Sequence, residues 1–473
     1  MFEEKCYEII NGNMLEELDK LEENLVDSIV TDPPYELNFM SKGWDNAGVS
    51  FQKETWKKCL RVLKPGGYLL AFGGSRTFHR IAVAIEDAGF EIRDTIMWLY
   101  GSGFPKSLNI GLAIDKKEGV ESDVVGVGVS GTSDTHTRCM SSETKDGKSV
   151  FGGEYEIKKA KNQWDGWGTA LKPSFEPVIV ARKPLEGSCV DNVIKYGVGG
   201  INVDECRIDF VDDVDYKITA DKNQHEKFGT KPMTNNNVYG DYSMVQPKNY
   251  NSTGRFPANT ILTYDDTDYN EVCGGFPYTI NSKRSSKNNK DTEYTNTYTP
   301  PKAIYTDDNT YGDEGSASRY FYCAKASAKD RDEGLDSFEE HRKAGYGYDL
   351  GFMNAGEGMF KDRKTLKKNI HPTVKPTTLM QYLVRLVTPK GGIVLDPFNG
   401  SGSTGKAVMF ENRERNANYK YIGVELSQEY CEIANARIFY ALNNYIYEPE
   451  INESDKKSIS SSNDNSKSSI TLW

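Results

Sequence analysis

The feature that most constrains the fold of this chain is a glycine-rich turn close to its C-terminal end. Residues 392–395 have the pattern of a buried strand, residues 399–405 form the run Asn-Gly-Ser-Gly-Ser-Thr-Gly, and residues 404–412 have a helical pattern. A strand, a glycine turn and a helix in this order normally open a doubly wound α/β sheet. Only 71 residues follow Gly402, and about 23 of them form a polar, serine-rich tail, so at most two further strands can follow. The other strands must come from the N-terminal part, which predicts a circularly permuted Rossmann-like fold.

The N-terminal part contains suitable strands and helices. Short apolar runs of strand length alternate there with segments of helical pattern, as in a mostly parallel α/β sheet. The predicted strands are residues 26–31, 67–72 and 95–99, and the predicted helices are residues 51–63 and 76–88. In the C-terminal part, a predicted helix at 378–387 and a predicted strand at 421–424 continue the alternation.

The middle of the chain has a different composition. Residues 281–300 contain no aliphatic side chain, and residues 216–253 are rich in Asn, Lys, Tyr and Gly, so this region cannot build a core like that of its flanks. We therefore expect a loop-rich inserted region. The expected divisions are an N-terminal half at 1–185 with a loop insertion at about 119–163, the inserted region at 186–360, a C-terminal half at 361–447 and a disordered tail at 448–473.

Composition narrows the class of protein. No run approaches the ~18 apolar residues of a membrane-spanning helix, and the N-terminus lacks the pattern of a signal peptide, so we expect a cytoplasmic protein. The cysteines form no C-x-x-C pair and the histidines no H-x-x-x-H pair, so no metal site is expected. With a formal net charge of -11, binding to nucleic acid would depend on local basic patches.

The glycine-rich turn permits three kinds of ligand and one purely structural role. Gly400, Gly402 and Gly405 fit the dinucleotide pattern G-x-G-x-x-G, with Glu425 placed to accept ribose hydroxyls. The turn also fits G-x-x-x-x-G-K, but Ala407 stands where a P-loop requires a Ser or Thr hydroxyl, which argues against an NTPase. A third interpretation is a Phe-x-Gly-x-Gly turn that approaches S-adenosylmethionine. A turn that serves packing alone is the fourth, and the turn by itself does not choose between them.

A rigid tetrapeptide, Asp32-Pro33-Pro34-Tyr35, follows the predicted strand 26–31. Two prolines cannot continue a strand ladder, so the segment must be a loop at the carboxyl edge of the sheet, where open α/β sheets bind ligands. A carboxylate and a prolyl carbonyl can accept both N–H bonds of the exocyclic amine of adenine or cytosine. Tyr35 offers a face on which an extruded base can stack. A structural turn with an Asp cap is the alternative interpretation.

Three motifs occur in a characteristic order along the chain. They are Asp32-Pro33-Pro34-Tyr35, His371-Pro372-Thr373-Val374-Lys375-Pro376 before a predicted helix, and Asp396-Pro397-Phe398-Asn399-Gly400-Ser401-Gly402-Ser403 after it. Together they resemble the motifs of the permuted, beta-class amino-group DNA methyltransferases, the N6-adenine/N4-cytosine family. The resemblance covers roughly residues 1–118, 164–185 and 364–440, and is closest to members from phages and restriction-modification systems. It implies a Rossmann-like methyltransferase fold in which residues 186–360 form a target-recognition region.

The resemblance implies a specific reaction. A site-specific enzyme of this family transfers a methyl group from S-adenosyl-L-methionine to the exocyclic amine of a base flipped out of double-stranded DNA. Asp as the first residue of the tetrapeptide is commoner among N6-adenine enzymes and Ser among N4-cytosine enzymes, which favours adenine here. Cytosine-N4 methylation, methylation of an amine in RNA, and a catalytically silent DNA-binding regulator are the alternatives. Relatives also suggest a homodimer and a cognate restriction endonuclease as partners.

The same resemblance implies roles for single residues. Asp32, Pro33, Pro34 and Tyr35 would hold the target amine. Phe398, Gly400, Gly402 and Glu425 would bind the cofactor, with Asp396 orienting the turn and Lys375 near the methionine end of the cofactor. One departure is Gly12-Asn13, where relatives often carry Gly-Asp, so a contact to the adenine side of the cofactor would lack its charge.

DNA binding by an acidic chain requires local basic residues. Residues 361–375 hold six Lys or Arg against one Asp, and residues 281–290 hold Lys and Arg without an acid. A solvated loop is the more ordinary interpretation of such runs. The candidate phosphate contacts are Lys283, Arg284, Lys364 and Lys367 in these runs, and Arg76, Lys106 and Lys172 near the edge that carries the tetrapeptide.

Overall fold

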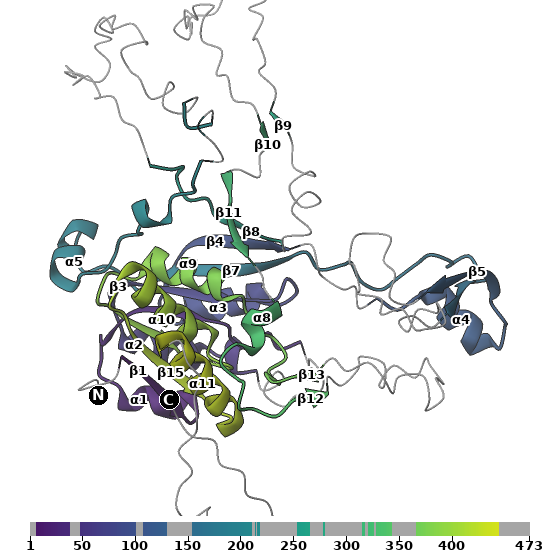
Figure 1. Ribbon diagram of the computed structural model, residues 1–473, viewed down its shortest axis with the longest axis horizontal. Helices are drawn as coiled ribbons and strands as arrows, with labels where there is room; N and C mark the ends of the chain where they lie inside the picture. Colours follow the sequence, from purple (N-terminus) through teal and green to yellow (C-terminus); the bar gives the residue numbers. More distant parts are fainter. Residues whose placement is uncertain are drawn as a thin grey trace, which may run out of the picture.

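A nine-stranded sheet forms the centre of the protein in the computed structural model (Figure 1). The structure describes residues 6–37, 48–100, 107–129, 154–210, 213, 215–217, 253–264, 278–279, 315–316, 320–325, 328–342 and 366–443. In spatial order, the strands are β1 (Tyr7–Asn11), β15 (Lys420–Glu425), β14 (Ile393–Asp396), β2 (Val26–Thr31), β3 (Leu63–Phe72), β7 (Phe175–Arg182), β4 (Glu91–Tyr100), β8 (Thr260–Tyr264) and β11 (Tyr322–Lys325).

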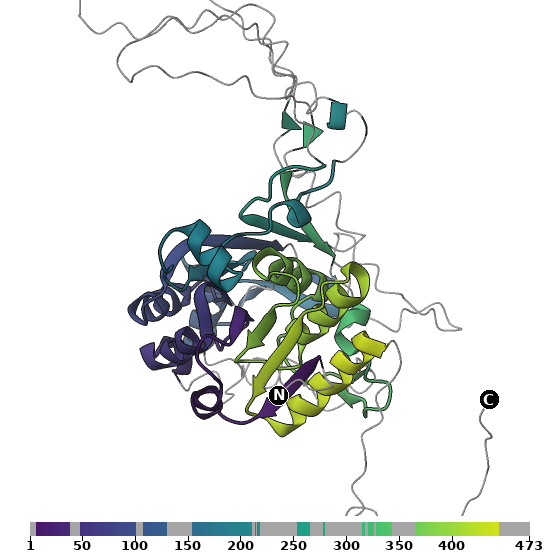
Figure 2. The ribbon, with the colours of Figure 1, turned by 90° about the vertical axis from the view of Figure 1, so that its left-hand side faces the viewer.

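The strand pairing confirms the predicted permuted, mostly parallel α/β fold. β14, which precedes the glycine turn, lies between β15 from the C-terminal part and β2 from the N-terminal part. At the edge of the sheet β1 pairs in parallel with β15, from Tyr7 beside Tyr421 to Asn11 beside Glu425. Figure 2 shows this purple N-terminal strand beside the yellow-green C-terminal elements. Only β7 runs antiparallel to its neighbours in the described sheet, pairing with β3 and β4.

The central strand β2 joins the two halves of the chain. All six of its residues are buried, as expected for a parallel strand covered on both faces. Polar side chains in such a strand need partners, and two of them find these in β14. Asp27 accepts a hydrogen bond from the backbone N–H of Ile393 at 2.7 Å, and Thr31 donates one to Asp396 at 2.6 Å. These bonds fix the position of β14 against β2 in addition to the backbone ladder.

Helices cover both faces of the sheet, and alternate residues of β3 pack against opposite layers. Leu69 lies in the core beneath α1 (Met14–Lys20), α2 (Lys53–Val62) and α3 (Phe78–Asp87). Leu70 lies in the core beneath α9 (Thr377–Val387), α10 (Ser403–Arg415) and α11 (Gln428–Asn443). None of the helices in the described ranges has the length and apolar character needed to cross a membrane.

Two strands from the segment 186–360 extend the main sheet. β8 pairs in parallel with β4, and β11 pairs in parallel with β8, so these residues belong to the sheet rather than to a separate insert. The rest of the expected division into halves and a recognition region stays a prediction. The other described elements of this region and its flank are α5 (Cys189–Tyr196), η4 (Asp204–Cys206), β9 (Tyr278–Thr279), β10 (Gly315–Ser316), α8 (Ala328–Asp332), β12 (His341–Arg342) and β13 (Leu366–Lys367).

The segment at about 119–163 contains regular structure where a loop insertion was expected. β5 (Asp123–Val129) and β6 (Glu154–Lys159) pair in an antiparallel ladder next to α4 (Ile110–Glu118). Figure 1 shows these elements at the right of the view, away from the helices that cover the sheet. Alternation of valine and glycine in residues 123–129 is weak evidence for a strand, which is why the sequence did not reveal it.

A buried ion pair between α9 and α10 provides a test of this packing. Arg385 donates to Glu411 at 2.5 Å, and the Glu411 side chain is 1% exposed. Replacing Arg385 with Met should lower the free energy of unfolding by about 3–5 kcal/mol, because the buried charge of Glu411 would keep only the distant and partly exposed Arg415, at 3.9 Å, as a cation. The double variant Arg385→Met/Glu411→Leu should recover most of this loss, since no buried charge remains.

Urea denaturation followed by circular dichroism measures these differences. Lys57→Met is the matched control, because it breaks an exposed ion pair with Glu54 and should cost less than about 1 kcal/mol. An equal loss of stability in the single and double variants would contradict the assigned role of the buried charge.

Candidate active site

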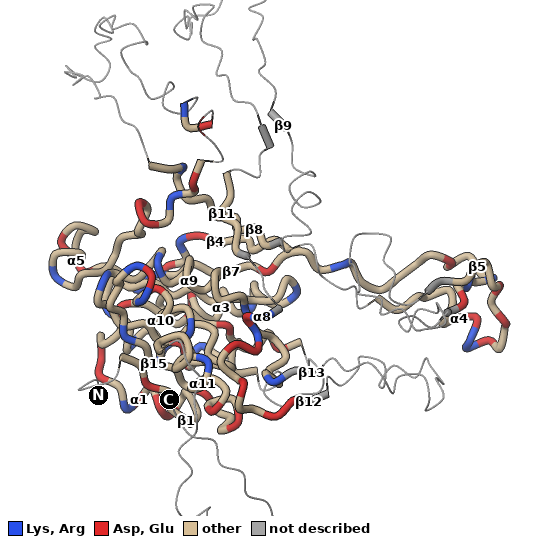
Figure 3. The backbone as a smooth tube through the Cα atoms, viewed as in Figure 1, with Lys and Arg blue, Asp and Glu red and all other residues tan. Residues whose placement is uncertain are grey.

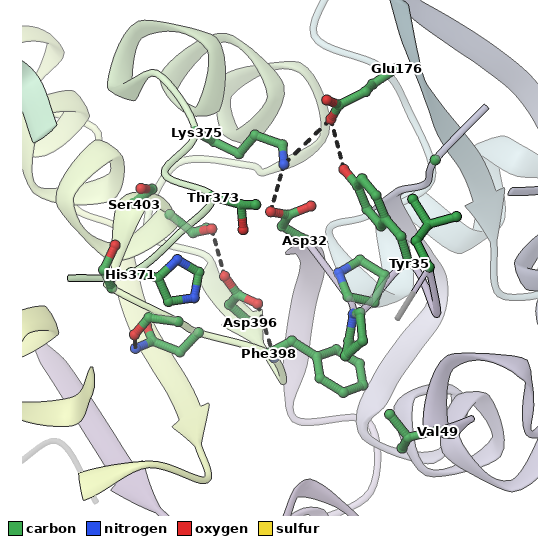
Figure 4. Close-up of a pocket in the computed structure, with 18 of the residues that line it drawn as sticks. Asp32, Tyr35, Val49, Glu176, His371, Thr373, Lys375, Asp396, Phe398 and Ser403 are labelled. Carbon is green, nitrogen blue, oxygen red and sulfur yellow. Dashed lines mark hydrogen bonds and ion pairs between the residues drawn. The ribbon is translucent and has the colours of Figure 1, made fainter. Parts of the chain in front are cut away.

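The described residues enclose a cavity of about 1440 Å³ at the carboxyl edge of the sheet (Figure 4). The ends of β2, β14 and β15 meet at this edge because these strands are parallel. β7 runs in the opposite direction, so its first residues reach the same edge. Of the predicted catalytic and cofactor residues, those that line the cavity are Asp32, Pro33, Pro34, Tyr35, Lys375, Asp396, Phe398, Gly400 and Glu425.

Asp32 follows directly after β2, and its two carboxylate oxygens have different surroundings. Oδ2 accepts a hydrogen bond from Lys375 Nζ at 2.6 Å. Oδ1 is buried and accepts no close hydrogen bond from the described residues, while a weaker interaction between the carboxylate and the Tyr35 hydroxyl favours the ionised form of Asp32. Burial raises the pKa of Asp32 despite the opposing effect of Lys375, and the negative charge of Glu176 adds to the increase. A buried acceptor of this kind is suited to an N–H donor from a ligand.

Lys375 lies between two carboxylates (Figure 4). Its Nζ is 2.6 Å from Asp32 Oδ2 and 3.4 Å from Glu176 Oε2, and the side chain is 7% exposed. The ammonium also lies over the rings of Tyr35 and Phe72, 5.2 and 5.0 Å from their centroids. Burial opposes the charge of Lys375, but the two neighbouring carboxylates raise its pKa. Its direct contact in the structure is therefore with the tetrapeptide.

Two residues of this cluster were missed by the sequence analysis. The Tyr35 hydroxyl donates to Glu176 Oε2 at 2.8 Å, and the Tyr100 hydroxyl donates to Glu176 Oε1 at 3.3 Å. Neither Glu176 nor Tyr100 belongs to a recognised motif. Glu176 reaches the site because β7 is antiparallel, and hydrophobic periodicity does not reveal the direction of a strand. The available signal was an acid next to the apolar, strand-length run 177–181.

The glycine turn combines ligand access with close packing. Gly400 has φ +52° and lines the cavity, and its N–H donates to Glu425 Oε2 at 2.8 Å. Gly402 has φ +75°, and a Cβ there would lie 2.9 Å from the Cβ of Ala434 in α11. Gly402 does not line the cavity. Its position is set by the left-handed backbone and by the packing of α10 on α11, which differs from the cofactor contact expected from the sequence.

Two carboxyl groups hold the ends of β14 and β15. Asp396 accepts hydrogen bonds from Thr31 at 2.6 Å and from Thr404 at 2.7 Å, and so joins the end of β2 to the start of α10. Glu425 accepts from the N–H of Gly400 and from that of Ser427, at 2.8 and 2.9 Å. Burial raises the pKa of Asp396 to about 6 and the pKa of Glu425 to about 6. Both groups are therefore ionised at neutral pH and become protonated in mildly acidic solution.

Lys406 does not serve the turn as a P-loop lysine would. Its side chain is fully buried, with Nζ 2.6 Å from Asp330 and 2.8 Å from Glu333, and it does not line the cavity. Together with Ala407 at the position where a P-loop requires a Ser or Thr hydroxyl, this placement argues against an NTPase. No group of three or more His, Cys, Asp or Glu side chains in the described ranges is arranged to hold a metal ion.

His371 and Asn13 complete the wall near the turn. The His371 ring packs edge-on against Tyr430, with ring centroids 4.7 Å apart, and burial lowers its pKa to about 3, helped by nearby cations such as Lys375. The imidazole is therefore neutral. Asn13 lines the cavity and caps α1 by accepting the N–H of Leu15 at 3.0 Å. Asn caps a helix as well as Asp does, so the departure from Gly-Asp does not disturb this helix.

The predicted DNA contacts are only partly within the described residues. Arg76 and Lys172 are exposed and line the cavity. Lys106, Lys283, Arg284 and Lys364 lie outside the described residues, and Lys367 is described by its backbone in β13 alone. Figure 3 shows that Lys and Arg are interspersed with Asp and Glu over the described chain.

The chain has relatives among known DNA methyltransferases. The orphan methyltransferase M.BamHII of Bacillus amyloliquefaciens is 45% identical over 76 residues, which are 16% of this chain and 25% of that protein. The type II methyltransferase M.HindIII of Haemophilus influenzae is 22% identical over 236 residues, which are 41% of this chain and 64% of that protein. The chain thus spans less than two thirds of the length of these relatives.

Two solved structures overlap with most of the chain. The M1.HpyAVI complex with SAM covers 91% of this chain and 99% of its own, at 14% identity and a TM-score of 0.31. PvuII DNA methyltransferase (cytosine-N4-specific) covers 96% of this chain and 93% of its own, at 12% identity and a TM-score of 0.37. Similarities at these TM-scores add nothing to the assignment. The model of the DNA methylase family N6_N4_Mtase, however, matches residues 26–436. The match confirms the resemblance read from the three motifs, and the chain belongs to the N6/N4 DNA methylase family.

Proposed function

We propose that this protein is a site-specific DNA methyltransferase that transfers a methyl group from S-adenosyl-L-methionine to the N6 amine of an adenine flipped out of double-stranded DNA. The observation that carries the proposal is the environment of Asp32. Lys375 holds its Oδ2 at 2.6 Å, whereas its buried Oδ1 accepts no close hydrogen bond from the described residues. Leaving a buried acceptor unsatisfied is unfavourable, and the N–H of an exocyclic amine would supply the donor.

Asp32 and Pro33 account for the chemistry. When bound, the cofactor supplies an electrophilic methyl group on a sulfonium. The amine is a poor nucleophile because its lone pair is delocalised into the ring. Hydrogen bonds to Asp32 Oδ1 and to the Pro33 carbonyl would favour a pyramidal nitrogen with its lone pair directed at the methyl group. As the N–C bond forms and the S–C bond breaks, Asp32 stabilises the positive charge on nitrogen and the proton then leaves to Asp32 or to water.

The size of the cavity supports two ligands. Pockets for one small molecule usually measure about 300–1,000 Å³. The cavity here is about 1440 Å³ and extends from the tetrapeptide to the glycine turn, so a cofactor and a flipped base can share it. Tyr35 forms part of the wall at the tetrapeptide end. Stacking of a base on such a ring contributes about 1–3 kcal/mol in single-strand binders.

The residues around the turn fit S-adenosylmethionine. Glu425 keeps free lone pairs on its carboxylate and can accept the ribose hydroxyls. Lys406, the lysine that follows the glycine turn in the sequence, forms ion pairs with Asp330 and Glu333 and does not line the cavity. A turn without a lysine for phosphate suits a cofactor that carries no phosphate. Phe398 and Asn13 line the cavity beside the turn and would contact the adenine end of the cofactor.

The choice of adenine over cytosine rests on Asp32 as the first residue of the tetrapeptide, through the family resemblance. Double-stranded DNA as the substrate is supported by the exposed Arg76 and Lys172 at the cavity. A cognate restriction endonuclease and a homodimer stay predictions from the family.

Replacing Asp32 with Ala should abolish methylation, with a loss of at least about 100-fold in rate, because the acceptor for the target amine is removed. Single-molecule sequencing of DNA from a methylation-free host that expresses the wild type or Asp32→Ala measures this directly. We expect N6-methyladenine at one recurrent sequence motif in the wild-type sample alone.

Asp19→Ala is the matched control, since it removes a carboxylate from an exposed ion pair with Lys58 and should keep the full activity. N4-methylcytosine at a recurrent motif would overturn the choice of base and keep the reaction. A folded wild type that binds cofactor and leaves no mark on DNA would favour RNA as the substrate or a regulator without activity.

Cofactor affinity should decrease as the pH falls below about 6, because Glu425 and Asp396 become protonated there. Protonation removes the charge with which Glu425 accepts ribose hydroxyls. Glu425→Gln should weaken binding at neutral pH by roughly tenfold and remove much of the pH dependence. Isothermal titration with S-adenosylmethionine across this pH range measures both effects, and the exposed Glu429→Gln is the control. An affinity that does not change with pH in the wild type would contradict the assignment.

A further inference from the structure

A carboxylate outside the recognised motifs, that of Glu176, lies at the centre of the cluster around Asp32. Its backbone is held in the sheet, since Glu176 pairs with Trp98 in the ladder between β7 and β4. The two preceding residues are also fixed, because Phe175 pairs with Leu99 and the N–H of Tyr100 donates to the Ser174 carbonyl at 2.9 Å. Glu176 therefore presents its side chain to the cavity from a rigid element rather than from a loop.

Both oxygens of Glu176 hold groups of the site. Oε2 accepts the Tyr35 hydroxyl at 2.8 Å and lies 3.4 Å from Lys375 Nζ, while Oε1 accepts the Tyr100 hydroxyl at 3.3 Å. Figure 4 shows Lys375 between Glu176 and Asp32, with Tyr35 on the other side of Glu176. Glu176 thus fixes the hydroxyl end of the ring on which a flipped base would stack, and it contacts the cation that holds Asp32.

The charges of this cluster do not cancel. Lys375 supplies one positive charge, and Asp32 and Glu176 each supply a carboxylate, in a setting where the three side chains are 7%, 18% and 22% exposed. If Lys375 faced Asp32 alone, the pair would be neutral. Sharing the ammonium with Glu176 leaves net negative charge beside the place where the amine would acquire positive charge.

We propose that Glu176 is a positioning residue for methyl transfer: it holds the Tyr35 ring and shares the Lys375 ammonium, so that the cluster around Asp32 carries net negative charge next to the target amine. The inference rests on the proposed function and adds a group that the motifs do not contain. Glu176 acts through Tyr35, Lys375 and Asp32, and does not itself touch the reacting atoms.

Two variants separate the two parts of this role. Glu176→Gln keeps an acceptor for the Tyr35 hydroxyl and removes the charge, whereas Tyr35→Phe removes the hydroxyl and keeps every charge. Tyr196→Phe is the matched control, because it deletes a similar hydrogen bond from a tyrosine hydroxyl to a carboxylate, that of Glu186 at 2.6 Å, and neither residue lines the cavity. The readout is the single-turnover rate of methyl transfer at saturating cofactor and DNA, measured as a function of pH, because product release can limit multiple turnovers.

We expect Glu176→Gln to slow methyl transfer by roughly 10- to 100-fold and to move the acid limb of the pH profile to lower pH. The shift follows because a neighbouring negative charge that disfavours ionisation of Asp32 is gone. The titratable groups that face Asp32 among the described residues are Tyr35, Glu176, Lys375 and, across the turn, Asp396. Because the cofactor is saturating, a loss of cofactor affinity on protonation of Asp396 and Glu425 does not dominate the acid limb. Tyr35→Phe should slow the reaction without lowering the acid limb, and Tyr196→Phe should keep the wild-type rate and pH profile.

Several results would overturn the inference. A Glu176→Gln protein with the wild-type rate would do so, and so would a slower one whose acid limb has not moved, since that is the behaviour of a merely structural residue. If Glu176→Gln does not fold, as judged by thermal unfolding and cofactor binding, the tyrosine variants decide: equal rates in Tyr35→Phe and the wild type exclude the positioning role. If the wild type methylates DNA and Glu176→Gln does so at the same rate, this inference alone is refuted. If the wild type is inactive, the inference and the proposed function are refuted together.

Discussion

The rest of the structure depends on the contact between β2 and β14. These strands are separated by more than 360 residues in the sequence, yet they lie side by side in the sheet and are bridged by the hydrogen bond from Thr31 to Asp396. Thr404 at the start of α10 donates to the other oxygen of Asp396 at 2.7 Å. One buried carboxyl group thereby holds the end of the strand that carries the tetrapeptide, the glycine turn and the helix after it. The two ends of the candidate site are aligned through this group.

The cost of this arrangement is the burial of charge. Asp32, Lys375 and Asp396 are all withdrawn from water, and their protonation states depend on one another as well as on burial. Such clusters are poor contributors to stability and are characteristic of functional sites. The buried pair of Arg385 and Glu411 between α9 and α10 shows the contrasting case, in which a buried carboxylate is compensated by a cation in direct contact and serves packing.

The sequence predicted most of the sheet and much of the candidate site. The strand 26–31 and the helix 378–387 were predicted to within a residue because prolines stand close to their ends, after the strand and on both sides of the helix. β1 was missed because it is an edge strand with half-buried residues and therefore has no strong pattern. β8 and β11 are short and stand in polar surroundings, so only their pairing with β4 identifies them. β7 was not among the predicted strands, and nothing in a single sequence would have given its direction, so Glu176 was missed as well.

The pairing of distant segments also determines how the chain could be divided. A break between β7 and α9 would separate a fragment with the tetrapeptide from a fragment with the glycine turn, and neither would contain a complete cavity. Each fragment would expose the edge of one strand, β2 in the first and β14 in the second. The partner of each exposed strand would lie in the other fragment. The β1 to β15 ladder adds a second contact of the same kind. The permuted order of the motifs therefore makes this fold a natural framework for fragment complementation, with reassembly of the sheet as the condition for activity.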